Sequence, residues 1–262
     1  MATLVCFHAH PDDEAISTGG SMAKASAAGH RVVLVVATGG EHGEKPSDLA
    51  PEETLGDRRR AETDRSALAL GIHRVVWLGY VDSGMQGWDQ NADLNSFHRA
   101  PLEDGASRLA AILREERADV LTTYDWHGTY GHPDHVKVHQ VGHRAAALAG
   151  TPVVYEATMN RDAIARFMEA AREAGEMPDG PPQTDDGNPF GTAEDELTTA
   201  VDVSGFLEAK RAALRAHASQ ISDTSFFLTM PAEVFSSAFG TEWFIRHGAP
   251  AGIHESELAG LG

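Results

Sequence analysis

The architecture of the chain follows from the segment Leu4-Val5-Cys6-Phe7 and from the motif directly after it, His8-Ala9-His10-Pro11-Asp12-Asp13-Glu14. The apolar run is typical of a buried strand, and the change to polar residues marks its end. The pattern recurs once, where the apolar run Val120–Tyr124 leads to Gly131-His132-Pro133-Asp134-His135. Two clusters of histidine and carboxylate at strand ends supply the ligands of one metal site, which points to metal-assisted hydrolysis.

Strand-like runs rich in β-branched residues alternate with helix-like stretches from the N-terminus onward. The predicted strands are Leu4–Phe7, Arg31–Thr38, Arg74–Tyr80, Val120–Tyr124 and Pro152–Ala157. The predicted helices are Ala15–Ala28, Glu53–Leu70, Leu102–Glu116, Asp134–Leu148 and Asp162–Ala174. This alternation predicts an α/β fold, with a mostly parallel sheet and helices on both of its faces.

The composition changes near residue 176. Residues 176–196 include four prolines, three glycines and many acids, which predicts a flexible loop. A helix is expected at Ser204–Ser219, and the mixed, aromatic segment Phe226–Ile245 is expected to complete a smaller C-terminal lobe. We therefore predict a catalytic core over residues 1–157 and a C-terminal lobe, which contains the loop, over residues 158–262.

Composition excludes several classes of protein. The 262 residues are 42% hydrophobic and 23% charged, which is typical of a globular protein, and the net charge of −18 disfavours nucleic acid and anionic membranes as partners. The single cysteine, Cys6, permits no disulfide within the chain and is predicted to be a buried strand residue. With neither a basic leader nor a long apolar run, the expected location is the cytoplasm. The sequence leaves open whether the chain forms a homo-oligomer.

Three residues of the two motifs are the candidate metal ligands. His10 and Asp13 are three residues apart at a strand-to-helix junction, so both can turn toward one point at the carboxyl edge of the sheet. His135 follows the other strand. Two imidazoles and one carboxylate form the usual ligand set of a catalytic zinc ion, with a position open for water. The same trio accepts ferrous iron, so both Zn²⁺ and Fe²⁺ fit the pattern.

Neighbouring residues suit the hydrolysis of an amide or a similar acyl bond. Asp12, beside a ligand, can act as the general base toward water. His132, if protonated, can stabilise an oxyanion or donate a proton to a leaving amine, and Asp134 can orient it. The hydroxyl of Tyr130 can polarise the scissile carbonyl.

Other histidines receive ordinary structural interpretations. His8 stands at the end of the first apolar run and is interpreted as a satisfied core residue or a polar surface residue. His42, His127 and His143 are interpreted in the same way, although His127 is close enough in sequence to line the pocket.

A non-catalytic protein with a structural metal is a rival hypothesis, but such zinc sites favour cysteine ligands. A nucleotide-binding module is disfavoured because no Gly-x-Gly-x-x-Gly follows the first strand.

The two motifs, Ala9–Glu14 and His132–His135, resemble those of the zinc-dependent deacetylases of the PIG-L/LmbE superfamily in order, spacing and strand context. The resemblance covers residues 1–157 well and the rest loosely. It implies a Rossmann-like core that binds no nucleotide and zinc held by His10, Asp13 and His135. It also implies Asp12 as the base, with His132 and Tyr130 serving the oxyanion and the leaving group.

Within that superfamily the chain is most similar to the mycothiol branch. Besides the segment Tyr124–Gly131, this similarity rests on Arg59-x-x-Glu62 and Asp82-Ser83-Gly84-Met85. It implies that Arg59 and Asp82 hold sugar or inositol hydroxyls, with Met85 also at the substrate. Two positions differ from patterns within this branch. Ser17 stands where the conjugate amidases tend to have lysine, as it does in the deacetylase. Trp126-His127 is bulkier than the Pro-Asn expected before Tyr130.

The predicted function is therefore removal of the acetyl group from an N-acetylglucosamine-type glycoside, such as N-acetylglucosaminyl-inositol. The expected partner is thus a small N-acetylated amino sugar. Two alternatives remain: an amidase that cuts mycothiol S-conjugates with the same machinery, and a deacetylase of another N-acyl sugar in secondary metabolism.

Overall fold

A computed structural model describes residues 1–173, 184 and 186–262 of the chain. Seven strands form one sheet in the order β3-β2-β1-β4-β5-β7-β6. The strands are β1 (Thr3–His8), β2 (Arg31–Thr38), β3 (Arg74–Tyr80), β4 (Val120–Tyr124), β5 (Val153–Thr158), β6 (Thr199–Asp202) and β7 (Thr241–Arg246). Neighbours among β1–β5 pair in parallel, whereas β7 is antiparallel to both β5 and β6. The prediction of an α/β fold with a mostly parallel sheet is confirmed.

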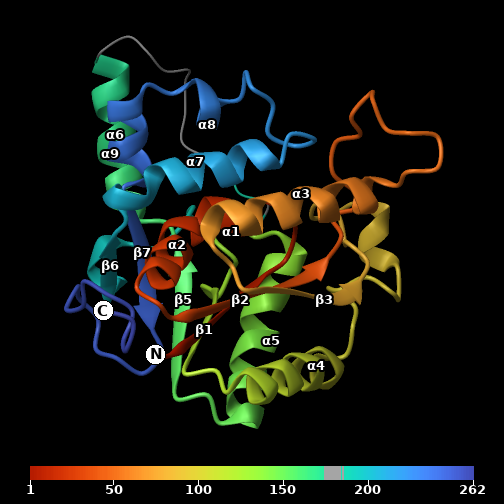
Figure 1. The fold of residues 1–262 in the computed structure, drawn as a ribbon, viewed down its shortest axis with the longest axis horizontal. Helices are drawn as coiled ribbons and strands as arrows, with labels where there is room; N and C mark the ends of the chain where they lie inside the picture. The colour runs from red at the N-terminus through yellow and green to blue at the C-terminus, as the bar shows by residue number, and fades with distance from the viewer. Residues whose placement is uncertain (174–183, 185) are drawn as a thin grey trace.

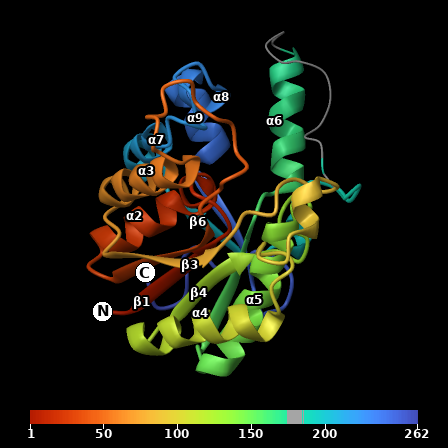
Figure 2. The ribbon, with the colours of Figure 1, turned by 90° about the vertical axis from the view of Figure 1, so that its right-hand side faces the viewer.

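Helices cover both faces of the sheet (Figures 1 and 2). The α-helices are α1 (Asp13–Ser17), α2 (Gly19–Ala27), α3 (Leu55–Leu70), α4 (Leu102–Glu116), α5 (Pro133–Ala149), α6 (Arg161–Glu173), α7 (Leu207–Ala216), α8 (Phe226–Thr229) and α9 (Ala232–Phe239). Short 3-10 turns, η1 (Asp89–Ala92), η2 (Glu194–Glu196) and η3 (Ser204–Phe206), complete the described elements. Helices α4 and α5 pack together on one face, and α2, α3 and α7 pack together on the other.

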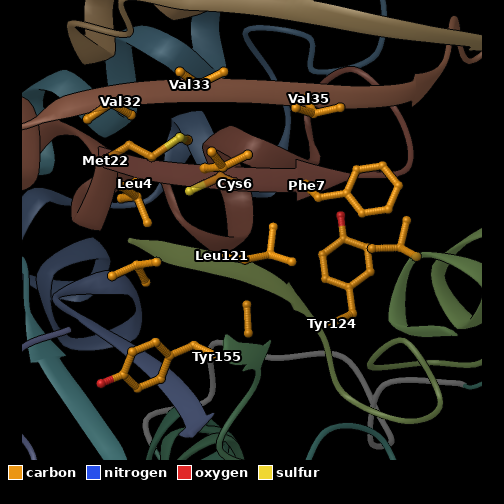
Figure 3. Close-up of a cluster of buried hydrophobic side chains, with 14 of the residues drawn as sticks. Leu4, Cys6, Phe7, Met22, Val32, Val33, Val35, Leu121, Tyr124 and Tyr155 are labelled. Atoms are coloured by element: carbon orange, nitrogen blue, oxygen red, sulfur yellow. The ribbon is translucent and has the colours of Figure 1, made fainter. Parts of the chain in front are cut away.

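Much of the core lies around the neighbouring strands β1 and β2 (Figure 3). Every residue of Leu4–Phe7 in β1 and of Val32–Ala37 in β2 is fully buried, because helices cover both faces of these strands. Phe7 meets Phe97 edge to face, with ring centroids 6.2 Å apart. Cys6 is buried in this cluster, as predicted. The buried apolar strands thus support the loops at the carboxyl edge of the sheet.

The single helix predicted at Ala15–Ala28 is wrong in one respect. The structure divides it into α1 and α2 at Thr18, whose φ of −135° is not helical. The Oγ1 atom of Thr18 lies 2.8 Å from the Nε2 atom of His8, so a buried side-chain contact holds the residue in this conformation. Likewise, the helix predicted at Ser204–Ser219 begins with the turn η3 and ends earlier, at Ala216.

The segment after residue 157 extends the same sheet. Strands β7 and β6 continue it beyond β5, and α7 packs on α3. The division into a core at 1–157 and a C-terminal lobe at 158–262 remains a prediction. Of the loop predicted at 176–196, residues 176–183 and 185 lie outside the described residues, as does Ala174 at the end of a predicted helix. Among the described helices, none has the length and apolar character needed to cross a membrane.

Candidate metal centre and active site

Two loops at the carboxyl edge of the sheet carry the candidate site. The chain leaves β1 at His8 and turns at Asp12, which has a φ of +97°, before α1 begins at Asp13. A non-glycine residue in this region is strained, and such residues concentrate at functional sites. The second loop runs from β4 to α5 and turns at Gly128, Thr129 and Gly131, all with positive φ.

The three predicted ligands meet between these loops. Asp13 Oδ2 lies 3.5 Å from His10 Nδ1, and Asp13 Oδ1 lies 3.4 Å from His135 Nε2. All three residues are buried. Metal–ligand bonds of 2.0–2.2 Å in a tetrahedron place neighbouring ligand atoms about 3.3 Å apart, close to both separations. We will call His10, Asp13 and His135 the inner cluster.

The other ring nitrogen of each inner-cluster histidine has its own acceptor. The carbonyl oxygen of Gly128 lies 3.2 Å from His135 Nδ1, which leaves Nε2 facing Asp13. This contact requires close approach of the loop, since a Cβ added at Gly128 would lie 2.2 Å from the Cβ of His135. The Nε2 atom of His10 lies 3.2 Å from Asp134 and 3.5 Å from Asp82. Such partners fix the tautomer and ring orientation of metal-binding histidines.

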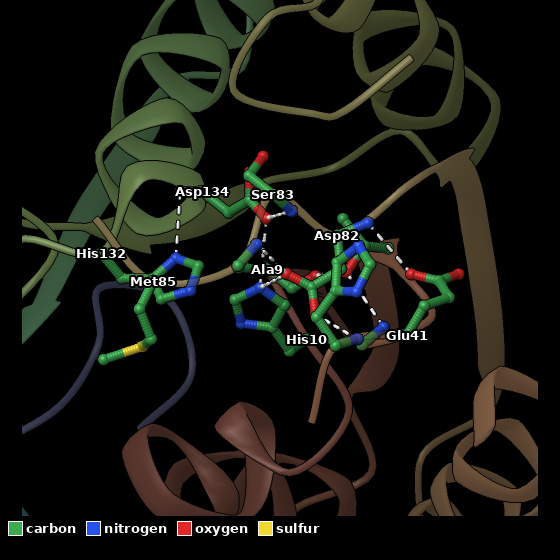
Figure 4. Close-up of polar contacts among 12 residues, drawn as sticks. Ala9, His10, Glu41, Asp82, Ser83, Met85, His132 and Asp134 are labelled. Atoms are coloured by element: carbon green, nitrogen blue, oxygen red, sulfur yellow. Dashed lines mark hydrogen bonds and ion pairs between the residues drawn. The ribbon is translucent and has the colours of Figure 1, made fainter. Parts of the chain in front are cut away.

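Asp134 supports His10 rather than His132 (Figure 4). Its carboxylate accepts hydrogen bonds from the hydroxyl and from the backbone N–H of Ser83, the latter at 2.9 Å, and contacts His10. The sequence predicts Asp134 as the orienting partner of His132. In the structure these two residues share a backbone contact instead, in which the Asp134 N–H donates to His132 Nδ1 at 3.1 Å.

Neighbouring charges shift the pKa values of Asp13 and His10 in opposite directions. Although burial alone would raise the pKa of Asp13, His135 and His10 hold it well below its usual range. Burial would lower the pKa of His10, but Asp82, Asp13 and Asp134 raise it. The inner cluster therefore joins an anionic carboxylate to imidazoles that lie in a strongly negative field, which is the environment that attracts a cation.

His132 and Tyr130 both lie against the inner cluster. The ring of His132 is 4.6 Å from that of His10 and 5.2 Å from that of His135, centroid to centroid. Burial, together with the nearby His10 and His135, lowers the pKa of His132 well below its usual range. Because Nδ1 accepts the Asp134 N–H, neutral His132 carries its proton on Nε2. The hydroxyl of Tyr130 lies 3.5 Å from His135 Nε2.

Asp12 has the ionisation expected of a general base. Burial and the like charge of Asp13 raise its pKa to about 6, while the guanidinium of Arg59 opposes the rise. Its carboxylate lies 3.2 Å from Arg59 Nη2 and its side chain keeps 18% of its surface exposed. A base whose pKa is close to neutral is well suited to proton transfer.

Two of the residues predicted to contact the substrate, Arg59 and Asp82, already form hydrogen bonds within the protein. Arg59 is buried and donates to the carbonyl oxygens of Pro11 and Gly40 as well as to Asp12. The carboxylate of Asp82 accepts the backbone N–H of Gly84 at 2.8 Å and of His42 at 3.1 Å. Met85 is half-buried, on the His132 side of the group in Figure 4.

Two buried networks behind the site are missed by sequence reasoning. Glu14 lies 2.6 Å from Ser66 Oγ and 2.6 Å from His217 Nε2, and it also accepts the N–H of Asp12. Burial opposes the charge on His217, but Glu14 raises its pKa. The network braces the strained turn at Asp12. No sequence signal joins Glu14 to a residue 203 positions away.

The second network places His8 in the core, one of the two roles that the sequence leaves open for it. Its Nδ1 atom lies 2.7 Å from the Tyr124 hydroxyl and its Nε2 atom 2.8 Å from Thr18 Oγ1. The ring of Tyr124 stacks on that of His135, with 4.7 Å between centroids. Tyr124 is the last residue of β4, directly before the second loop. This position is the sequence signal from which its place beside the site can be predicted.

The donor set fits a catalytic divalent cation. Nitrogen atoms of His10, His132 and His135 lie within 4.8 Å of one another, and Asp13 bridges two of these rings. His10 also forms such a group with Asp82 and Asp134, but those carboxylates already accept hydrogen bonds from Ser83, Gly84 and His42. The inner cluster could therefore hold the ion, with Asp82 and Asp134 in supporting positions beside His10.

Comparison with known proteins identifies the family of the chain. The family model PIG-L, GlcNAc-PI de-N-acetylase, matches residues 5–146, which contain both motifs. A 1D-myo-inositol 2-acetamido-2-deoxy-alpha-D-glucopyranoside deacetylase from a Nocardioides species is 39% identical, over 92% of this chain and 90% of that protein. The enzyme of the same name from Acidothermus cellulolyticus is 40% identical, over 94% and 88%.

Solved structures share the fold at lower identity. The N,N'-diacetylchitobiose deacetylase from Pyrococcus horikoshii aligns with a TM-score of 0.61 and 23% identity, over 93% of this chain and 83% of that one. A 4-carboxy-2-hydroxymuconate hydratase from Pseudomonas putida aligns with a TM-score of 0.59 and 17% identity, over 95% and 97%. One fold therefore serves different reactions. Family membership rests on the sequence matches, which show that the chain belongs to the PIG-L family of GlcNAc-PI de-N-acetylases.

Proposed function

We propose that the chain is a metal-dependent N-deacetylase that removes the acetyl group from an N-acetylglucosamine-type glycoside, with N-acetylglucosaminyl-inositol as the leading substrate. The observation that carries this proposal is the inner cluster, with Asp12 beside it and His132 and Tyr130 facing it. The names of the relatives support the choice of substrate.

Zn²⁺ is the proposed ion, with Fe²⁺ as the alternative, and His10, Asp13 and His135 would hold it. When bound, it supplies Lewis acidity toward a carbonyl oxygen and toward water. The orientation of the two histidines by the Gly128 carbonyl and by Asp134 and Asp82 supports this assignment.

Asp12 is the proposed general base. It takes a proton from the attacking water as the water oxygen adds to the acetamide carbon. Its raised pKa lets it return that proton to the amine nitrogen when the C–N bond breaks. The products are acetate and the free amine. Glu14 and Arg59 hold the turn and the carboxylate in place.

His132 and Tyr130 are proposed to stabilise the carbonyl oxygen as it becomes negatively charged. A neutral His132 offers its Nε2–H as a donor, and the Tyr130 hydroxyl offers a second. The low pKa of His132 favours this role over donation of a proton to the leaving amine, the other role that the sequence leaves open for it. Arg59, Asp82 and Met85 are retained as the proposed neighbours of the sugar or of its aglycone.

The first experiment measures amine release from N-acetylglucosaminyl-inositol and from simple N-acetylglucosamine. Metal-stripped protein is assayed with and without added Zn²⁺. We expect activity only with metal, and faster release from the inositol glycoside. Metal binding without release from either compound would reject the proposed substrate class, whereas equal rates on both would reject the role of the inositol.

A second candidate, hydrolysis of a larger amide that carries an apolar group, is favoured by one observation. A hollow of about 500 Å³ lies beside α1, where Ile16 and Ser17 line it. Its other walls include aromatic residues of α6, α8, α9 and β7, such as Phe167, Phe227 and Trp243. Polyhydroxylated rings do not need such a surface. Amine release from a bimane conjugate of mycothiol at a higher kcat/KM than from the inositol glycoside would favour this candidate.

A further inference from the structure

A second group of metal-type side chains lies further along the same helix. His139 and His143 follow His135 at intervals of four residues, so all three project from one side of α5. Glu156 of the neighbouring strand β5 completes the group. Donor atoms of His139, His143 and Glu156 all lie within 4.8 Å of one another. We will call these three residues the outer cluster.

The contacts within the outer cluster leave donor atoms that a metal ion can use. Glu156 Oε1 lies 2.8 Å from His143 Nε2 and 3.9 Å from His139 Nδ1. The Nδ1 atom of His139 also lies 2.9 Å from the carbonyl oxygen of Tyr124. An N–H at Nδ1 that donates to this carbonyl leaves a lone pair on Nε2, which is the usual arrangement of a metal-binding histidine.

A fourth donor lies beside the outer cluster. The ring of His247 is 4.7 Å from that of His143, and the backbone N–H of His247 donates to the carbonyl of Val154 at 2.9 Å. The four side chains line a surface hollow of about 610 Å³. The exposed fractions of the His139, His143 and Glu156 side chains are 23%, 21% and 13%. An ion can therefore enter from solvent and keep water ligands.

We propose that His139, His143 and Glu156, with His247 as a further ligand, form a second binding site for a divalent transition-metal ion. Imidazole donors select Zn²⁺, Ni²⁺ or Cu²⁺, whereas Mg²⁺ and Ca²⁺ require sites built from oxygen ligands. The net charge of −18 favours the approach of cations to the chain. On this proposal His143 is a metal ligand, whereas the sequence interpretation gives it an ordinary structural role.

The second site is distinct from the inner cluster but adjoins it through Tyr124. The ring of Tyr124 stacks on His135, whereas its carbonyl oxygen contacts His139. The two sites share no ligand, so each can be removed without the other. The proposal therefore does not rest on the deacetylase function, and it can hold where that function fails.

The test is a count of bound metal. Metal-stripped protein is dialysed against Zn²⁺, and the bound ions per chain are measured by elemental analysis and by calorimetric titration. We expect two ions in the native chain and one in the double variant His143→Gln, His247→Gln. We also expect one ion in Asp13→Asn, with a Zn²⁺-dependent rise in Tm that Mg²⁺ does not reproduce. His254→Gln, an exposed histidine elsewhere, is the matched control and should still bind two ions.

Three outcomes would overturn the proposal. These are a single ion in the native chain that the double variant also retains, two ions still bound by the double variant, and none bound by Asp13→Asn. Circular dichroism shows whether each variant is folded, and the deacetylase rate with Zn²⁺ bound is a second check for the double variant. If the double variant fails to fold, Glu156→Gln alone should lower the affinity of the second class of sites at least about tenfold, and an unchanged titration would reject the site.

Discussion

The inner and outer clusters use the same kinds of donor atom on one helix but differ in their surroundings. The inner cluster is buried, and the histidines beside Asp13 have a carbonyl or carboxylate at the far ring nitrogen. In the outer cluster His139 alone has such a carbonyl contact, and the side chains keep up to 23% of their surface exposed. From this contrast we infer that ligand type alone does not make a catalytic centre. An adjacent base, oriented rings and restricted water access are also needed.

The strongest test of this comparison removes one ligand from each cluster. In Asp13→Asn we expect the deacetylase rate to fall at least about 10,000-fold. The metal contributes several kcal/mol of transition-state stabilisation, and about 5.5 kcal/mol corresponds to that factor. Amine release at saturating Zn²⁺ gives the rate. His143→Gln is the matched control, and its rate should stay within about twofold of the native rate. An equal loss in both variants would mean that the outer cluster is also catalytic.

The next test separates metal binding from proton transfer inside the inner site. Asp12→Asn should lower kcat by about 100- to 10,000-fold, because it removes the general base but no ligand. The variant should bind Zn²⁺ with the same stoichiometry as the native chain, which elemental analysis measures. Unchanged turnover would reject Asp12 as the base. Loss of metal together with activity would instead assign Asp12 to the ligand set.

A smaller effect is expected from the support of His10. Asp134→Asn should weaken Zn²⁺ binding at the inner site by about 10- to 100-fold, because the carboxylate no longer orients the imidazole. Competition with a chelator gives the affinity, and activity at saturating Zn²⁺ should recover in large part. Asp64→Asn, on the exposed side of α3, controls for the change of charge. Unaltered affinity in Asp134→Asn would show that burial alone orients His10.

The sequence predicts that the inner-cluster residues lie together because they are local to two strand ends. His10 and Asp13 lie in one turn, and the parallel pairing of β1 with β4 brings His135 beside them. The fully apolar runs of β1 and β2 likewise predict their burial. The sequence does not predict what depends on long-range packing. Thr18 divides a helix because it contacts His8, and the carboxylate of Asp134 turns to Ser83 and His10.

The outer cluster shows the same limit. His139 and His143 are close in sequence, but Glu156 and His247 reach them only through the order β4-β5-β7 in the sheet. The joining of β7 to the parallel strands is not visible in a mixed segment such as Phe226–Ile245, and β6 lies outside every strand predicted from the sequence. Patterns of apolar residues give the elements, whereas the pairing of distant elements decides which polar side chains meet.

The smallest expected effect concerns pH and again distinguishes the two clusters. Asp12 acts only when ionised, and its pKa is raised to about 6, so kcat should fall below about pH 6 with a one-proton slope. Arg59 lowers this pKa, hence Arg59→Met should move the acidic limb to higher pH, by about one unit for roughly 1.4 kcal/mol of lost interaction. Arg59→Lys keeps the charge and should keep the limb. His143→Gln should leave the whole profile unchanged, since the outer cluster carries no step. Profiles of kcat between pH 4.5 and 8, at saturating Zn²⁺, measure all of these variants. If the acidic limb of the Arg59→Met profile stays at the same pH as in the native chain, Asp12 is not the group whose ionisation controls turnover.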